Sequence, residues 1–219
     1  MTRVLIALTS HSELGDTGRS TGFYASEAAE PWSVFKDAGF DVDLVSVAGG
    51  KPPVDGVDES DPDQQRFFAE ADLDNTPTAA DLTATDYDAI FYAGGHGAMW
   101  DFPGDKALAS LAAGIYENGG VVAAVCHGPA GLVELRLSDG SYLVDGKNVA
   151  GFTNSEENAV GLTEVVPYLL ADALTAHGAI HHPAADFTDQ VITDGRLVTG
   201  QNPASARSTA AAVTAVLKG

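Results

Sequence analysis

The feature that most constrains the fold is a short apolar run, Val121–Val125, which follows two glycines and ends at Cys126, the only cysteine of the 219-residue chain. Continuous β-branched and small apolar residues are typical of a strand buried on both faces, as in a parallel sheet. Gly128 and Pro129 end this strand, and residues 130–135 predict the first turns of a helix. The sequence therefore predicts a sharp strand-to-helix turn at the cysteine, which is the geometry of a nucleophile elbow.

The predicted position of Cys126 suits a reactive thiol. The carboxyl ends of parallel strands are where open α/β sheets bind ligands. The thiol would also lie near a helix N-terminus, whose dipole is expected to lower its pKa. The alternative is an inert core cysteine, which is common after an apolar run. The adjacent His127 and the tight turn favour the reactive thiol, because an inert core position needs neither.

Strand and helix patterns alternate along the rest of the chain without a long linker, which predicts one α/β domain over residues 1–219. The sheet should be mostly parallel, with helices on both faces. Residues 48–86 are rich in Pro, Asp and Gly and are predicted to be an inserted loop region with a short helix over 63–71. Pro31 predicts a break in the first helix. The remaining predicted strands span residues 3–8, 41–47, 87–93, 146–152, 190–192 and 197–199, and the remaining helices 22–38, 105–118 and 204–217.

The charge balance limits the classes of partner. The chain has 31 acidic and 11 basic residues, a net charge of -20. Such a surface repels nucleic-acid phosphates and anionic lipids, so neither nucleic acid nor a membrane is expected as a partner. One cysteine excludes an internal disulfide framework and fits a reducing compartment. The apolar run at 3–8 is too short for a signal peptide, and we expect a cytoplasmic protein.

A second glycine-rich turn, Gly94-Gly95-His96-Gly97, follows the predicted strand 87–93. Its backbone amides, together with the Gly128 amide, could point at a developing oxyanion. The alternative is an ordinary tight turn between strand and helix. The spacing matches neither a dinucleotide fingerprint nor a phosphate-binding loop, so no nucleotide cofactor is predicted.

A cysteine nucleophile needs a base, and that base needs a group that orients it. His127 is the nearest candidate base. Glu156 or Glu157 could hold its imidazole in one tautomer, and Glu27 is a second carboxylate with apolar neighbours. By spacing alone, each carboxylate could equally be a surface residue.

Other polar and aromatic residues give weaker signals. His181 and His182, near His177, match no strong zinc motif, so no metal site is predicted there. His96 could reach the pocket or could simply bond to backbone in its turn. Trp100 could line the pocket or could be packed in the core or at its rim.

Five segments that span nearly the whole chain resemble the ThiJ/PfpI superfamily, and within it the glutathione-independent glyoxalases (glyoxalase III) and chaperone-like stress proteins. This resemblance implies a flavodoxin-like sandwich, a single class I glutamine amidotransferase-like domain, no cofactor and a homodimer. The matching segments are Glu27–Val45, Ala93–Pro103, Gly119–Pro129, Gly151–Glu157 and Ile192–Ser205.

The resemblance also implies a role for each predicted site residue. The sequence departs at Glu30, where some close relatives are expected to have histidine, and at Arg207, where histidine is common, and the first departure could alter substrate preference. The implied roles are Cys126 as nucleophile, His127 as its neighbouring base, Glu157 as the acid paired with that histidine, Glu27 as a hydrogen-bond partner of the thiol, and the amides of Gly95 and Gly128 as the oxyanion hole.

The activity that the resemblance implies is conversion of methylglyoxal, a small aldehyde, to lactate without glutathione or metal, a lyase-type reaction that detoxifies methylglyoxal. It would run through a hemithioacetal at Cys126, with Glu27 or His127 moving the proton. The alternatives are a deglycase, another cysteine-dependent hydrolase or hydratase, and a holdase chaperone or redox-sensing stress protein. The non-enzymatic alternatives predict function that survives loss of Glu27 or His127.

Overall fold

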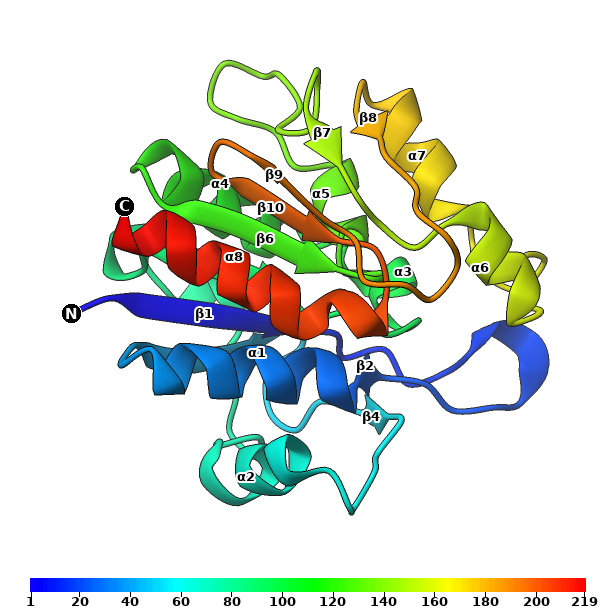
Figure 1. Ribbon diagram of the computed structural model, residues 1–219, viewed down its shortest axis with the longest axis horizontal. Coiled ribbons are helices and arrows are strands. Elements are labelled where there is room, and N and C mark those ends of the chain that lie inside the picture. The colour runs from blue at the N-terminus through cyan, green and yellow to red at the C-terminus, as the bar shows by residue number, and fades with distance from the viewer.

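Six strands form one central sheet in the computed structural model, which describes residues 1–219 (Figure 1). The strands are β1 (Arg3–Leu8), β3 (Asp41–Ser46), β5 (Ala89–Tyr92), β6 (Val121–Val125), β9 (Val191–Asp194) and β10 (Leu197–Gly200). Their order is β3-β1-β5-β6-β10-β9, and all neighbours are parallel except β10 and β9. A two-residue turn joins this last pair. The predicted α/β fold with a mostly parallel sheet is confirmed.

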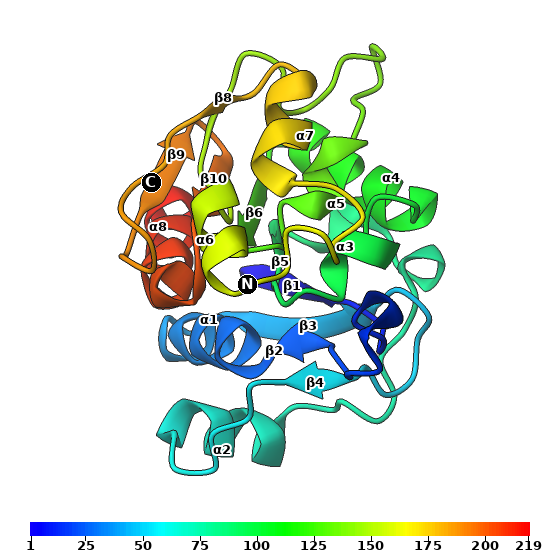
Figure 2. The same ribbon diagram turned by 90° about the vertical axis from the view of Figure 1, so that its right-hand side faces the viewer.

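Helices cover both faces of the sheet (Figure 2). On one face lie α1 (Ala25–Asp37) and α8 (Ala206–Lys218), which pack against each other and against the strands. On the other lie α3 (Ala98–Asp101), α4 (Lys106–Glu117) and α5 (Ala130–Val133). Two further helices, α6 (Asn154–Ala159) and α7 (Leu170–Ala176), stand beyond the carboxyl ends of the strands and the β10 side of the sheet, and α2 (Pro62–Glu70) packs on α1.

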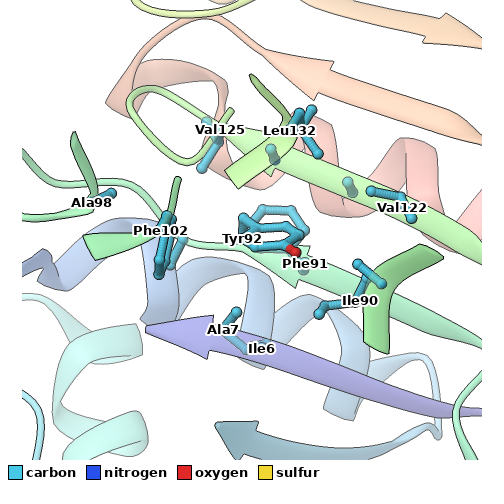
Figure 3. Close-up of a cluster of buried hydrophobic side chains, with 14 of the residues drawn as sticks. Ile6, Ala7, Ile90, Phe91, Tyr92, Ala98, Phe102, Val122, Val125 and Leu132 are labelled. Carbon is cyan, nitrogen blue, oxygen red and sulfur yellow. The ribbon is translucent and has the colours of Figure 1, made fainter. Parts of the chain in front are cut away.

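The sheet buries side chains on both faces, as the continuous apolar runs predicted (Figure 3). In β5, Phe91 meets Phe35 of α1 with ring centroids 5.9 Å apart, whereas the next residue, Tyr92, meets Phe102 at 5.3 Å on the opposite face. Successive side chains of a strand point to opposite faces, so one strand contributes to two layers of core. Burial of each such ring contributes roughly 2–3 kcal/mol.

The first helix differs from the prediction in two ways. It begins at Ala25 rather than near residue 22, because β2 (Phe23–Tyr24) pairs first with β4 (Val54–Asp55). It also continues without a break through Pro31. A proline removes one amide donor from the ladder, and the contacts that this buried helix makes with the sheet and α8 outweigh that loss.

The segment 146–152, predicted as a strand, contributes only β7 (Asn148–Val149), which pairs with β8 (Ile180–His181) outside the main sheet. The inserted region 48–86 contains the predicted short helix as α2, together with β4. None of the helices combines the length and the hydrophobicity that a membrane-spanning segment requires. The short 3-10 turns are Gly15–Thr17, Ala79–Asp81, Ala84–Asp86 and Pro203–Ser205.

Candidate active site

The predicted strand-to-helix turn is present at Cys126, directly after β6. Cys126 has a φ of 59°, in the left-handed region that non-glycine residues rarely adopt. Neighbouring backbone fixes this conformation: the Cys126 amide donates to Gly200 O at 3.0 Å, and its carbonyl accepts from Phe152 N at 2.9 Å. Cys126 as a whole is 4% exposed. A strained backbone held on both sides presents the sulfur at the carboxyl edge of the sheet.

His127 and Glu157 form a buried pair beside the thiol. His127 Nε2 lies 2.7 Å from Glu157 Oε2, and His127 Nδ1 lies 3.4 Å from Cys126 Sγ. A carboxylate can only accept, so Nε2 carries the imidazole proton and Nδ1 is left as an acceptor facing the thiol. His96 Nε2 donates to the other oxygen, Glu157 Oε1, at 2.9 Å. Three residues predicted separately are thus brought together.

The electrostatics of this pair follow from burial and hydrogen bonding. Burial alone would raise the pKa of Glu157, but the hydrogen bonds from His127 and His96 lower it to about 2. Burial, with the nearby His96, lowers the pKa of His127 to about 4 despite its carboxylate partner. At neutral pH the arrangement is therefore an ionised Glu157 that orients a neutral imidazole.

Glu27, in the first turn of α1, also lies beside the thiol. It is fully buried, and neither carboxyl oxygen accepts a hydrogen bond of normal geometry. Burial raises its pKa to about 8, although the Cys126 thiol and the Gly94 amide act in the other direction. Gly94 makes room for this carboxyl, because a Cβ there would lie 2.2 Å from Glu27 Oε2. Glu27 is therefore a basic carboxylate placed against the nucleophile.

The thiol itself does not have the lowered pKa that the helix N-terminus suggested. Burial raises the pKa of Cys126 well above its ordinary value, and the Glu27 carboxylate raises it further. The following helix, α5, has only four residues, so its dipole is small. The expectation of a resting thiolate is wrong, because desolvation and a like charge outweigh the helix.

The structure also changes the predicted oxyanion site. The Gly128 amide donates to Val125 O at 2.7 Å and closes the turn, so it is not free for a ligand. The His127 amide, by contrast, points at the sulfur. Gly95, with a φ of 106°, leaves its amide without an acceptor in the protein. The two available amides are therefore those of Gly95 and His127.

A cavity of about 330 Å³ contains the thiol. Trp100 does not line this cavity and instead stacks on His11, with centroids 4.9 Å apart, so of the two alternatives the packing role holds and the place in the pocket is wrong. Gly94 lies behind Glu27 rather than on the cavity surface. The lining residues are Leu14, Arg19, Tyr24, Glu27, Asp55, Gly95, His96, Cys126, His127, Phe152, Val160, Leu162, Phe187 and Pro203.

Several of these lining residues were missed from the sequence. Tyr24 precedes a helix whose start was placed too early. Phe152 packs on His127 with the two rings tilted by 36° and their centroids 4.3 Å apart, and it was assigned only to a strand. Phe187 carried no sequence signal, because nothing in the loop around it predicts a contact with the elbow.

The choice between the two neighbouring glutamates is settled by geometry. Glu156 turns away from His127 and belongs to a capping box at the start of α6, where Thr153 Oγ1 accepts from its amide at 3.1 Å. This Thr-x-x-Glu pattern is a sequence signature of a helix start. Applied to residues 153–156, it would have identified the helix and left Glu157 as the acid for His127.

The two departures from the family pattern pair with each other away from the thiol. Arg207 Nε lies 3.7 Å from Glu30 Oε2, and Arg207 also bonds Asp63. Neither Glu30 nor Arg207 lines the cavity. A direct effect of Glu30 on substrate therefore has no basis in this geometry.

Metal-ligating groups gather at one place only. The donor atoms of His96, His127 and Glu157 all lie within 4.8 Å of one another, which is close enough to share an ion. Both imidazole Nε2 atoms, however, already donate to the carboxylate, so a metal bound through them would require both rings to change tautomer and both hydrogen bonds to break. His177, His181 and His182 lie outside the cavity. His177 lies beside Glu134, and His182 is hydrogen-bonded to Asn148.

The elbow, the buried carboxylates and the order of the strands can be compared with known proteins. The model of the DJ-1/PfpI family matches residues 20–215. The chain belongs to this family. The family assignment drawn from the sequence motifs is thereby confirmed.

Similar proteins match over nearly the full chain. The glutathione-independent glyoxalase HSP31 of Saccharomyces cerevisiae is 38% identical, over 95% of this chain and 94% of its own. Glyoxalase 3 of Candida albicans is 35% identical, over 100% of this chain and 99% of its own. Among solved structures, glyoxalase III of Candida albicans superimposes with a TM-score of 0.90 at 34% identity, covering 98% and 97% of the two chains. The rapid encystment protein of Francisella tularensis gives a TM-score of 0.95 at 38% identity, with 99% of each chain covered.

Proposed function

We propose that this protein is a glutathione-independent glyoxalase that converts methylglyoxal to lactate. The names of the similar proteins from Saccharomyces cerevisiae and Candida albicans support this activity. The observation that carries it is that the chain's only thiol lies beside two separate proton carriers. One is Glu27, with a pKa of about 8, and the other is the His127–Glu157 pair.

In the first step the Cys126 sulfur adds to the aldehyde carbon of the substrate. Because the pKa of the thiol is raised, its proton must leave as the C–S bond forms, and Glu27 is the base that faces it. The aldehyde oxygen becomes the oxyanion of a hemithioacetal, which takes the thiol proton from Glu27 and so leaves that carboxylate free for the next step. The amides of Gly95 and His127 are the donors available to it.

In the second step a proton moves from C1 to C2 of the bound substrate. Removal of the C1 proton gives an enediol, and return of a proton to C2 gives a lactoyl thioester on Cys126. C1 is oxidised and C2 is reduced within one molecule, so no external oxidant or reductant is needed. We assign this transfer to Glu27, since a carboxylate with a pKa near 8 is a stronger base than an imidazole with a pKa near 4.

In the last step water hydrolyses the thioester and releases lactate and the free thiol. His127 Nδ1 accepts a proton from that water, while Glu157 holds the imidazole in the required tautomer. The whole reaction adds one water to methylglyoxal. A neutral substrate is not repelled by a chain with a net charge of -20.

The proposed enzyme works as a homodimer in a reducing compartment such as the cytoplasm. The family resemblance supports the dimer, and light scattering on the purified protein tests it. The proposed mechanism needs Cys126 as a reduced thiol, and this need supports a reducing compartment. In an oxidising compartment the single cysteine would be open to modification.

The test is lactate formation from methylglyoxal without glutathione and after chelation of metals, for the wild type and Cys126→Ser. We expect turnover by the wild type and its loss in the variant, which keeps a polar group of similar size. Absence of turnover by a folded wild type with a reduced thiol would reject the proposal. Equal turnover by the variant would reject Cys126 as nucleophile.

A further inference from the structure

The chain has only two non-glycine residues with positive φ, and both line the same cavity. One is Cys126, and the other is Phe187, with a φ of 56°. For a bulky residue this conformation is a genuine outlier and persists only where the surroundings hold it. The Phe187 side chain is 46% exposed, so burial of its ring does not explain the strain.

Glu156 holds the backbone of Phe187 in place. Its Oε1 atom accepts from the Phe187 amide at 2.8 Å, and the same oxygen accepts from Gln201 Nε2 at 3.1 Å and Asn202 Nδ2 at 2.8 Å. The Oε2 atom accepts from the Thr153 amide at 2.9 Å and its hydroxyl at 3.0 Å. This fully buried carboxylate is thus bonded by five neutral donors. It fastens the Phe187 loop to α6 and to the end of β10.

The Phe187 ring continues a row of rings that begins at the thiol. Phe152 packs on His127 with centroids 4.3 Å apart, and Phe187 meets Phe152 edge-on at 6.2 Å. Val160, another exposed apolar residue at 41%, lines the same cavity. The part of the cavity lining formed by Phe152, Val160 and Phe187 is therefore apolar, although Arg19 and Asp55 line the same cavity.

We propose that Phe187 determines substrate specificity at this site and that Glu156 is its positioning residue. The inference rests on the proposed function. When the aldehyde carbon is bonded to Cys126, the substituent on the ketone carbon extends away from the sulfur into the remaining cavity. An aromatic or branched apolar substituent reaches the ring of Phe187, whereas a methyl group offers it little surface. The preferred substrates are α-oxoaldehydes with an apolar substituent larger than methyl.

The test compares kcat/KM for phenylglyoxal and methylglyoxal in the wild type and Phe187→Gly. Glycine adopts positive φ without strain, so this variant removes the ring while the loop keeps its path. We expect the phenylglyoxal to methylglyoxal ratio to fall about fivefold, the effect of losing one aromatic contact. Phe68→Ala is the matched control, because Phe68 is also exposed, at 37%, but lies on α2 outside the cavity. An unchanged ratio in Phe187→Gly would overturn the proposal.

The role of Glu156 is tested in the same assay. Glu156→Gln places an amide group among partners that are all donors, so the Phe187 loop loses part of its anchor. We expect this variant to lower the substrate ratio when Phe187 is present and to have no further effect on the ratio in Phe187→Gly. A general structural defect would lower kcat/KM for both substrates by the same factor and leave their ratio unchanged. A further fall of the ratio in the double variant would reject the positioning role.

Failure of the proposed function is separated from failure of this inference by alkylation. Cys126 is the only thiol, so its rate of reaction with iodoacetamide and with the N-benzyl analogue is followed by mass without any turnover. We expect Phe187→Gly to lower the benzyl to unsubstituted rate ratio about fivefold. If the wild type is inactive on both oxoaldehydes but Phe187→Gly still lowers the alkylation ratio, the glyoxalase activity alone is rejected. An unchanged alkylation ratio rejects the role of Phe187.

Discussion

Glu157 fixes the tautomer of His127: the 2.7 Å hydrogen bond from Nε2 to Oε2 leaves Nδ1 free to face Cys126 Sγ at 3.4 Å. The carboxylate accepts from His96 as well, so two imidazole protons are held by one buried anion. This arrangement separates orientation from proton transfer. Glu157 stays ionised and orients the ring. The weakly basic imidazole faces the thiol and, in the last step, the water that hydrolyses the thioester.

Glu157→Gln should therefore slow the last step of the reaction more than the first. A glutamine can accept through one atom only, so one of the two imidazole N–H groups loses its partner and His127 loses its fixed tautomer. We expect turnover to fall about 10²- to 10³-fold. Intact mass spectrometry after mixing with methylglyoxal should show a lactoyl adduct on the protein that the wild type does not accumulate. Fast turnover without an adduct would contradict the assigned role.

Glu27→Gln should change thiol reactivity and turnover in opposite directions. Removal of the carboxylate takes away a like charge that raises the pKa of Cys126, so that pKa should fall. We expect faster alkylation by iodoacetamide near pH 9, where Glu27 is ionised in the wild type, and turnover reduced about 10²-fold, because the base is lost. The thiolate absorbance in the ultraviolet, titrated against pH, reports the pKa. A variant with a higher thiol pKa would show that the carboxylate is not the dominant neighbour.

Glu27 should also make the protein less stable as pH rises. Its pKa is about 8 in the folded chain and near 4.5 when unfolded, so between these values the folded state binds more protons. Stability contributed by the protonated form is full at pH 4 and is lost progressively up to about pH 8. We expect Glu27→Gln to have a free energy of unfolding about 3–5 kcal/mol above that of the wild type at pH 9, and one close to it at pH 4. Urea unfolding at both pH values measures this, and a difference that does not grow with pH would contradict it.

The sequence allowed the sheet and the elbow to be predicted because both rest on local patterns. Runs such as Val121–Val125 have no polar residue to place on a solvent face, so a buried parallel strand was the only arrangement that suited them. The end of β6 then had to fall at Cys126, where glycine and proline begin. The pairing of Cys126 with His127 follows from their adjacency at this turn.

The rest depended on packing that no local pattern encodes. The pKa of the Cys126 thiol is set by complete burial against Glu27, which is 99 positions away in the chain and arrives through the packing of α1. The free amide at the elbow belongs to His127 rather than Gly128, because the turn consumes the glycine amide. Phe187 has a positive φ, which a bulky residue rarely adopts, and no local pattern predicts that conformation. Its place on the cavity wall is therefore known only from the structure.

Gly94→Ala should displace Glu27 and damage the site. An added Cβ would lie 2.2 Å from Glu27 Oε2 and 2.6 Å from Val125 O, and the second contact is with backbone that cannot shift cheaply. We expect a free energy of unfolding lower by about 1–3 kcal/mol, together with turnover reduced by more than tenfold as the carboxyl is pushed from the thiol. Gly104→Ala is the matched control, because a Cβ at residue 104 meets nothing within 4 Å and its φ is not positive. Urea unfolding and lactate formation are measured for both variants. If Gly94→Ala behaves like Gly104→Ala, the close packing of Gly94, Glu27 and Cys126 is not what positions the carboxyl.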